Sequence, residues 1–280
     1  WGASLPRCQG KNGWESSWLA TGQERRFAMQ RRMQQSDILR ALVEDIQQQP
    51  DQPITSVVTG SCLTAVTSRN LGLASLISHF VPGQISAQAP TGPTSVHAAA
   101  ILLLDAATTN TDAASLAVAA GNSLLPLPAA ATTMSGQELL LTFGRGRNVA
   151  VVGHFPFVEK LRESCAGFWV LEKHPRPGDT PAEEAGGVLP RADVVAVTAT
   201  TLLNGSLAGL LALCRSDALV ILLGPTTPFA PSLFACGIDV LAGCETPDPE
   251  AALAGIRAGS CFKKLSGVRQ LTWMRPGLSA

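Results

Sequence analysis

A short apolar run that ends at a glycine constrains the fold of this chain more than any other feature. Residues 149–152 read Val-Ala-Val-Val, and Gly153 follows at once, with helix-like sequence after it. A buried strand that turns through a glycine into a helix is the first unit of a Rossmann-like α/β fold. The turn lacks the other glycines of the dinucleotide fingerprint and carries a histidine, two phenylalanines and a proline at 154–157. We therefore expect a ligand other than a plain pyrophosphate at this turn.

Strand-like and helix-like segments alternate regularly after residue 144. We expect strands at 148–152, 168–172, 193–198, 218–223 and 238–242. Helices are expected in the gaps, at 157–165, 181–187, 204–214, 230–235 and 248–258. Alternation of this kind is typical of a parallel sheet with right-handed crossovers.

The segment before residue 144 has a different order of elements. A helix that Ser36 caps is followed by a predicted hairpin at 54–59 and 62–67, and then by helices at 94–107 and 112–125. Strands followed by helices indicate an α+β unit. We therefore predict three parts: a poorly ordered extension over 1–35, a small α+β domain over 36–143, and a Rossmann-like α/β domain over 144–280.

Four turn motifs in this order resemble those of a known prokaryotic family. They are Gly153–Phe157, Glu172–Asp179, Thr198–Gly205 and Leu223–Pro228. The family is the one labelled "putative heavy-metal chelation", and the resemblance covers roughly residues 36–275. It implies that an enolase-N-terminal-like domain precedes the Rossmann-like domain, and that the protein handles a metal or a metallo-ligand. The chain departs from the family pattern at His174, where an asparagine is expected.

The four motifs should share one rim, because ligands of open parallel sheets bind outside the carboxyl ends of the strands. We expect the site in the cleft between the two domains, where pockets commonly form. The residues predicted to bind a ligand or cofactor are Gly153, His154, Glu172, Thr200, Asn204 and Thr226. The residues predicted to bind a transition metal are His154, Glu172 and His174.

His154 and Glu172 are compatible with two classes of function. A neutral imidazole can ligate a metal ion or move a proton, although it can also simply hydrogen-bond a neighbouring turn. Glu172 lies nineteen residues after Gly153, which is about where a Rossmann acid binds ribose hydroxyls. The alternative to metal handling is therefore an enzyme that uses a nucleoside cofactor, such as S-adenosylmethionine or a dinucleotide. Whether the chain is an enzyme stays open.

Two polar residues of the rim have structural interpretations as well. Asp179 follows Gly178 and is expected to cap the helix that begins near Pro181. Asn204 is expected to start a helix, whose free N–H groups could hold an anion.

Composition narrows the class of partner. The formal net charge is zero, and a general nucleic-acid binder would need a basic excess. No apolar run is long enough to span a bilayer, and a cytoplasmic location is expected. The seven cysteines form no C-x-x-C pair, so we expect neither a disulfide framework nor a thiolate zinc site, and most cysteines should be small buried hydrophobic residues. A homo-oligomer is compatible with the sequence.

Overall fold

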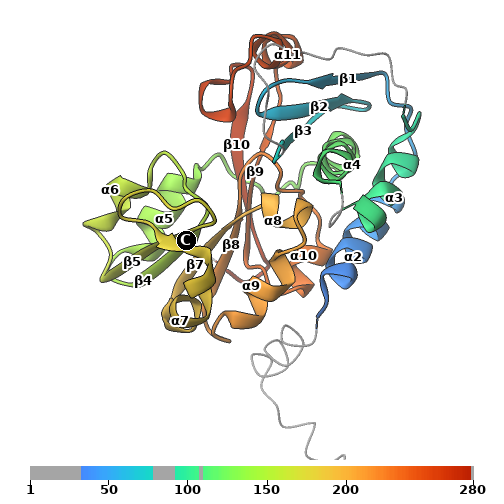
Figure 1. Ribbon diagram of the computed structural model, residues 1–280. Helices are drawn as coiled ribbons and strands as arrows, with labels where there is room; N and C mark the ends of the chain where they lie inside the picture. The colour runs from blue at the N-terminus through green and yellow to red at the C-terminus, as the bar shows by residue number, and fades with distance from the viewer. Residues whose placement is uncertain (1–32, 78–91, 107–109, 279–280) are drawn as a thin grey trace, which may run out of the picture.

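A computed structural model describes residues 33–77, 92–106 and 110–278 (Figure 1). The predicted extension over 1–35 falls almost entirely outside these residues. The described chain contains a three-stranded sheet and a seven-stranded sheet.

The seven-stranded sheet has the strand order β10-β9-β8-β7-β4-β5-β6. Six of its strands are parallel, and β10 runs antiparallel to β9. The strands are β4 (Asn148–Val152), β5 (Gly167–Glu172), β6 (Thr180–Pro181), β7 (Val194–Thr198), β8 (Leu219–Leu223), β9 (Val240–Glu245) and β10 (Arg269–Met274). The predicted parallel α/β fold is confirmed, and all five predicted strands are present. The edge strands β6 and β10 were not predicted.

Helices cover both faces of this sheet, because the side chains of its strands alternate between two apolar clusters. Ala150 and Val195 join one cluster, whereas Val149 and Val151 join the other. The helices α2 (Gln35–Gln47), α8 (Thr200–Leu203), α9 (Leu207–Leu213) and α10 (Ser232–Ala235) supply side chains to the first cluster. The second cluster includes side chains of α5 (Gly136–Gly144) and α6 (Val158–Arg162).

The three-stranded sheet is antiparallel, in the order β1-β2-β3. Its strands are β1 (Ser56–Thr59), β2 (Leu63–Thr67) and β3 (Leu71–Ser75), so the predicted hairpin is confirmed. One face packs against α4 (Thr111–Leu124) and the other against α11 (Pro249–Arg257) (Figure 1). Gly72 permits the first contact, since a Cβ atom there would lie 2.1 Å from the carbonyl oxygen of Ala119 in α4.

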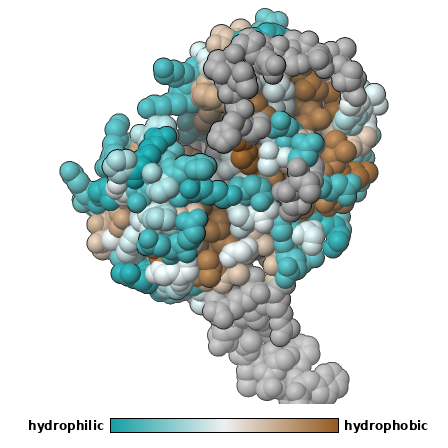
Figure 2. Space-filling view, viewed as in Figure 1, coloured by the Kyte–Doolittle hydropathy of each residue, from teal (hydrophilic) through white to brown (hydrophobic). Residues whose placement is uncertain are grey.

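Several remaining short elements connect these layers. They are η2 (Ala182–Glu184), α7 (Ala185–Val188), η3 (Leu189–Arg191) and η4 (Phe262–Lys264). The longer helix α3 (Val96–Ala106) packs against α4 and α2. Figure 2 shows mostly hydrophilic side chains over β4, β5 and α6, whereas apolar ones gather over α3 and α4. Among the described helices, none combines the length and the apolar character that crossing a membrane requires.

Two predicted helix starts are corrected. The first helix begins at Gln35 rather than after Ser36, because the Asp37 carboxylate accepts the backbone N–H of Gln34 at 2.9 Å. The helix predicted over 204–214 begins only at Leu207, as α9, and a separate short helix, α8, ends before it at Leu203. Gly205 separates them with a φ of +75°, a left-handed conformation that suits glycine. Asn204 therefore ends α8 instead of starting a helix, and its Oδ1 accepts the backbone N–H of Ser206 at 3.2 Å.

The two sheets are tied together more closely than a boundary near residue 144 suggests. Helix α5 packs on the seven-stranded sheet although it precedes that residue, and α11 packs on the three-stranded sheet. Cys62 and Cys261 form a disulfide across this junction, so the expectation that the cysteines are simple hydrophobic residues is wrong for this pair. The division at 143/144 stays a prediction.

Candidate functional site

The turn after β4 lies where the order of the strands reverses. The chain passes from β4 to β5 and β6 on one side, and then to β7 on the other side of β4. Such a switch point is where open α/β sheets bind ligands. Gly153 takes a φ of +100°, and a Cβ atom there would lie 3.1 Å from the Cγ2 atom of Thr198. The turn is therefore narrow, and only glycine fits it without strain.

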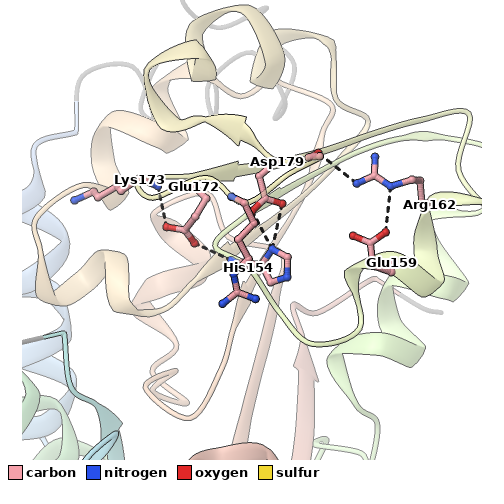
Figure 3. Close-up of polar contacts among 8 residues, drawn as sticks. His154, Glu159, Arg162, Glu172, Lys173 and Asp179 are labelled. Atoms are coloured by element: carbon pink, nitrogen blue, oxygen red, sulfur yellow. Dashed lines mark hydrogen bonds and ion pairs between the residues drawn. The ribbon is translucent and has the colours of Figure 1, made fainter. Parts of the chain in front are cut away.

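His154 is held by an aspartate from the neighbouring loop (Figure 3). Its Nδ1 atom lies 3.0 Å from Oδ2 and 3.1 Å from Oδ1 of Asp179. The Asp179 side chain is 1% exposed and that of His154 is 16% exposed. An ionised carboxylate can only accept, so the contact assigns the proton of a neutral ring to Nδ1. The lone pair of Nε2 is then available to a metal ion or to a proton.

Asp179 also organises the loop that carries it. Its Oδ2 accepts the backbone N–H of Arg176 at 3.0 Å, and its own N–H donates to the Arg176 carbonyl at 2.9 Å. Gly178 closes this turn with a φ of +92°. The predicted role of Asp179 as a helix cap is wrong, because η2 receives no side-chain cap. Its carboxylate instead positions the ring of His154.

Glu172 contacts the same turn through backbone groups rather than through the ring of His154. Its Oε2 accepts the backbone N–H of His154 at 2.9 Å, and its Oε1 accepts the backbone N–H of Lys173 at 2.8 Å. Figure 3 shows these contacts, together with Arg162, which donates to the Gly178 carbonyl at 3.4 Å and pairs with Glu159. The carboxylate of Glu172 thus joins the ends of β4 and β5.

The other predicted site residues are spread along the rim. Thr200 lies after β7 and shares a 3.0 Å hydrogen bond with the hydroxyl of Thr198. Thr226 is buried and accepts the backbone N–H of Ser75 at 2.8 Å, which links the turn after β8 to β3. His174 is exposed in the loop after β5. In the described part of the chain, no three His, Cys, Asp or Glu side chains are grouped so that they could hold a metal ion.

A pocket of about 500 Å³ borders the β4 turn. Phe155, Pro156 and Phe157 form one wall, and Leu63 and Ser75 of the three-stranded sheet contribute another. The two phenylalanine rings are stacked, with centroids 5.4 Å apart. Lys160 and Lys263 also line the pocket. Aromatic rings beside ammonium groups suit a small ligand that has a flat apolar part and an anionic part.

Two of these features could hardly be predicted from the sequence. Asp179 lies 25 residues after His154, and their contact depends on β6, an edge strand of only two residues. The pocket wall from β2 and β3 depends on how the two sheets pack, which no local pattern encodes. A signal for Asp179 was present in Gly178, because a glycine before an aspartate is typical of a tight turn.

A family model described as "Putative heavy-metal chelation" matches residues 136–275. This range holds His154, Glu172 and Asp179, as well as all strands of the seven-stranded sheet. The four turn motifs that suggested the resemblance all lie within it.

Two crystal structures of proteins of unknown function from the DUF364 family resemble this fold. The protein from Desulfitobacterium hafniense DCB-2 is 26% identical, with a TM-score of 0.72, and the match covers 85% of this chain and 98% of that one. The protein from Pyrococcus horikoshii is 20% identical, with a TM-score of 0.68, and the match covers 86% of this chain and 100% of that one. At 20% identity, the similarity to the Pyrococcus horikoshii protein shows only a shared fold. A search of curated proteins finds no match.

Proposed function

Since the chain belongs to the DUF364 family, whose model is described as "Putative heavy-metal chelation", we propose that it binds a transition-metal ion carried by a small chelating ligand. His154 is the protein's donor to that ion. The ligand lies at the β4 turn and extends into the cleft between the two sheets. Two observations support this function: the description of the family model and the contact between His154 and Asp179.

The observation that carries the proposal is the contact between Asp179 and His154. Metal-binding histidines usually donate their second ring N–H to a carboxylate, a carbonyl or a water, which fixes the tautomer and raises the basicity of the ligating nitrogen. Here Nδ1 lies 3.0 Å from a carboxylate that is almost fully buried. The Nε2 atom is left as the ligating atom, and imidazole nitrogen suits Zn²⁺, Cu²⁺, Fe²⁺ and Ni²⁺.

A chelated ion fits this site better than a bare ion, because a single imidazole fills one coordination position. No cluster of three candidate ligands occurs among the described residues. The donors of a chelating small molecule would fill the other positions. The sequence also predicts Glu172 and His174 as ligands. Glu172 ends β5 and His174 lies in the loop after it, but both oxygens of Glu172 already accept backbone N–H groups. They would join the coordination only if that loop rearranged.

The cleft supports the organic part of the ligand. Phe155 and Phe157 of the His154 turn present stacked rings to the 500 Å³ pocket, and Lys160 and Lys263 place positive charge beside them. Chelators of transition metals are commonly anionic, because carboxylate, phenolate or thiolate donors bind these ions. The same pocket would therefore hold an anionic chelator by charge and by its flat apolar surface.

A nucleoside cofactor is the second candidate, and the order of the strands favours it. The reversal between β4 and β7 is the place where Rossmann-like folds bind nucleotides. Against it, both carboxylate oxygens of Glu172 accept backbone N–H groups, so the acid is less available to ribose hydroxyls. Thr198 also lies close to Gly153, where a pyrophosphate would approach.

Equilibrium dialysis with copper(II) iminodiacetate tests the proposal, because this chelate leaves coordination positions open for an imidazole. We expect the parent protein to bind one chelate and His154→Ala to bind it at least tenfold more weakly. His97→Gln is the control, since the His97 ring contacts the Gln49 carbonyl at 2.9 Å, away from the rim. Equal binding by His154→Ala would refute the proposal. Thermal stabilisation by S-adenosylmethionine or a dinucleotide, without any by the chelate, would support the second candidate.

A further inference from the structure

We propose that Cys62 and Cys261, once reduced, form a separate site for one soft, thiophilic metal ion in the wall of the same pocket. The two residues are 199 positions apart in the chain, yet their Cα atoms lie 5.3 Å apart and they form a disulfide. Both residues line the 500 Å³ pocket. The site does not involve His154, so it stands whether or not the proposed function is correct.

The backbones on either side hold the pair in place independently of the disulfide. The Cys62 carbonyl accepts the N–H of Leu76 at 2.9 Å, and the Cys261 carbonyl accepts the N–H of Lys264 at 2.9 Å. The hydroxyl of Ser61 donates to the Gly259 carbonyl at 3.0 Å, directly between the two segments. A Cβ atom on Gly60 would lie 2.5 Å from the carbonyl oxygen of Ile256 in α11. The hairpin and the end of α11 therefore stay in contact after reduction, and so do the two thiols.

The other thiols that the structure describes are unsuited to this chemistry. Burial raises the pKa of the Cys236 thiol to about 11, helped by the charges of Asp45 and Asp37. Burial, together with the charge of Glu245, raises the pKa of the Cys244 thiol to about 12. Burial also raises the pKa of the Cys165 thiol. The buried Cys214 thiol donates to the Leu210 carbonyl at 3.3 Å. Cys62 and Cys261 differ from them because they are a pair, and because Lys160 and Lys263 line their pocket with positive charge.

Two thiolates at this separation can hold one ion between them. A metal–thiolate bond is about 2.3 Å long, so two opposed bonds need sulfur atoms about 4.6 Å apart. Rotation about the Cα–Cβ bonds can reach this spacing when the Cα atoms are 5.3 Å apart. Two thiolates suit soft ions such as Cu⁺ or the heavier d¹⁰ ions. The two lysines offset the charge that the thiolates bring to the pocket.

The pair binds a metal ion in two steps, reduction of the disulfide and then exchange of the thiol protons for the ion. A thiol reductant first cleaves the disulfide: two equivalents of RSH supply two electrons and two protons, which gives two cysteine thiols and RSSR. A divalent ion then displaces both thiol protons to form the bis-thiolate complex, so two protons are released for each ion bound. Oxidation of the pair abolishes the site. The redox state of the pair therefore decides whether the pocket wall holds an ion.

Cd²⁺ is the probe, used with the full chain in a Cys8→Ser background because Cys8 lies outside the described residues. The reduced protein, freed of reductant without oxygen, should bind one Cd²⁺ with an ultraviolet thiolate-to-metal charge-transfer band. Cys62→Ser and Cys261→Ser should each lower the affinity at least tenfold and remove the band. Cys244→Ser, the control, and His154→Ala should keep both. The oxidised protein should show no band.

The proposal is overturned if either serine variant at Cys62 or Cys261 binds Cd²⁺ as the reduced parent does, or if the oxidised parent binds it equally well. The reduced parent is its own folding control, since it also lacks the disulfide. It should melt cooperatively, and loss of that transition on reduction would also overturn the proposal. If His154→Ala abolishes the Cd²⁺ band, the two sites are one, and the separate site is refuted.

Discussion

The imidazole of His154 and the carboxylate of Asp179 are 3.0 Å apart although 25 residues separate them in the chain. The first follows β4, and the second precedes the edge strand β6. Their contact orients a histidine at the point where the strand order of the sheet reverses. The proposed metal-ligand function depends on this pair more than on any other feature.

Asp179→Asn should weaken binding of copper(II) iminodiacetate by about 10–100-fold, the usual cost of losing a partner behind a metal ligand. An amide can donate to Nδ1, which moves the ring proton to Nε2 and blocks the ligating lone pair. Dialysis beside the parent protein measures the change. Glu159→Gln, which alters an exposed carboxylate near the same loop, is the control and should bind normally. Unchanged binding by Asp179→Asn would argue that the pair is only structural.

Gly153→Ala should destabilise the fold by about 1–3 kcal/mol, because the residue has a φ of +100° and Thr198 lies 3.1 Å from the new methyl group. Chemical denaturation measures the effect. Gly209→Ala is the matched control, since no heavy atom lies within 4 Å of its Cβ position in α9, and it should be neutral or stabilising. Adding Thr198→Ser should recover only the steric part of the loss. Full stability of Gly153→Ala would contradict the described turn.

Arg275→Ala should cost about 1–3 kcal/mol, because it removes a partner from a buried carboxylate. Asp239 is 2% exposed, and its Oδ1 accepts from Arg275 Nε at 2.6 Å. Arg269→Ala, at the start of the strand that Arg275 follows, is the comparison. It breaks an ion pair with Glu245 in which the arginine is largely exposed, so about 1 kcal/mol or less is expected. Denaturation midpoints rank the two variants, and an equal loss for both would be inconsistent with the buried pair.

Iodoacetamide should alkylate the cysteines at different rates. In the reduced, folded protein at pH 8, Cys62 and Cys261 should react well before Cys236 and Cys244. Raised pKa values of about 11 and about 12 keep the latter two as neutral thiols at that pH, and only the thiolate is nucleophilic. Their rates should therefore rise with pH, about tenfold per unit, throughout the range below those pKa values. Peptide mass spectrometry reads each site, and denaturant should equalise the rates. Fast labelling of Cys236 in the folded protein would contradict this ranking.

The central strands of the seven-stranded sheet could be predicted from the sequence, but its two edge strands could not. Strands β4, β7 and β8 are continuous apolar runs that are buried on both faces, and such runs are recognisable in isolation. Strand β10 begins with the exposed residues Arg269 and Gln270, so it lacks that signal. Strand β6 has two residues and no signal at all.

The candidate site, too, could be predicted from the sequence only in part. His154 and Glu172 follow strong strands, so their place on the rim could be predicted. The direct contact between them, which runs through the backbone N–H of His154, was not predicted. The partner of the ring, Asp179, is fixed by a turn and an edge strand that only the folded chain defines. The pairing of Cys62 with Cys261 depends on the packing of the hairpin against α11. The hairpin ends at Thr67, and α11 begins only at Pro249.

Electron paramagnetic resonance of the copper(II) iminodiacetate complex tests the central claim most directly, because nitrogen couplings report which ring binds the ion. The parent protein should show coupling to an imidazole nitrogen, and labelling the histidines with ¹⁵N should change its pattern. His97→Gln should give the same spectrum as the parent, and His154→Ala should lose the imidazole coupling. If His154→Ala keeps the imidazole coupling of the parent, His154 is not the ligand and the proposed function is wrong.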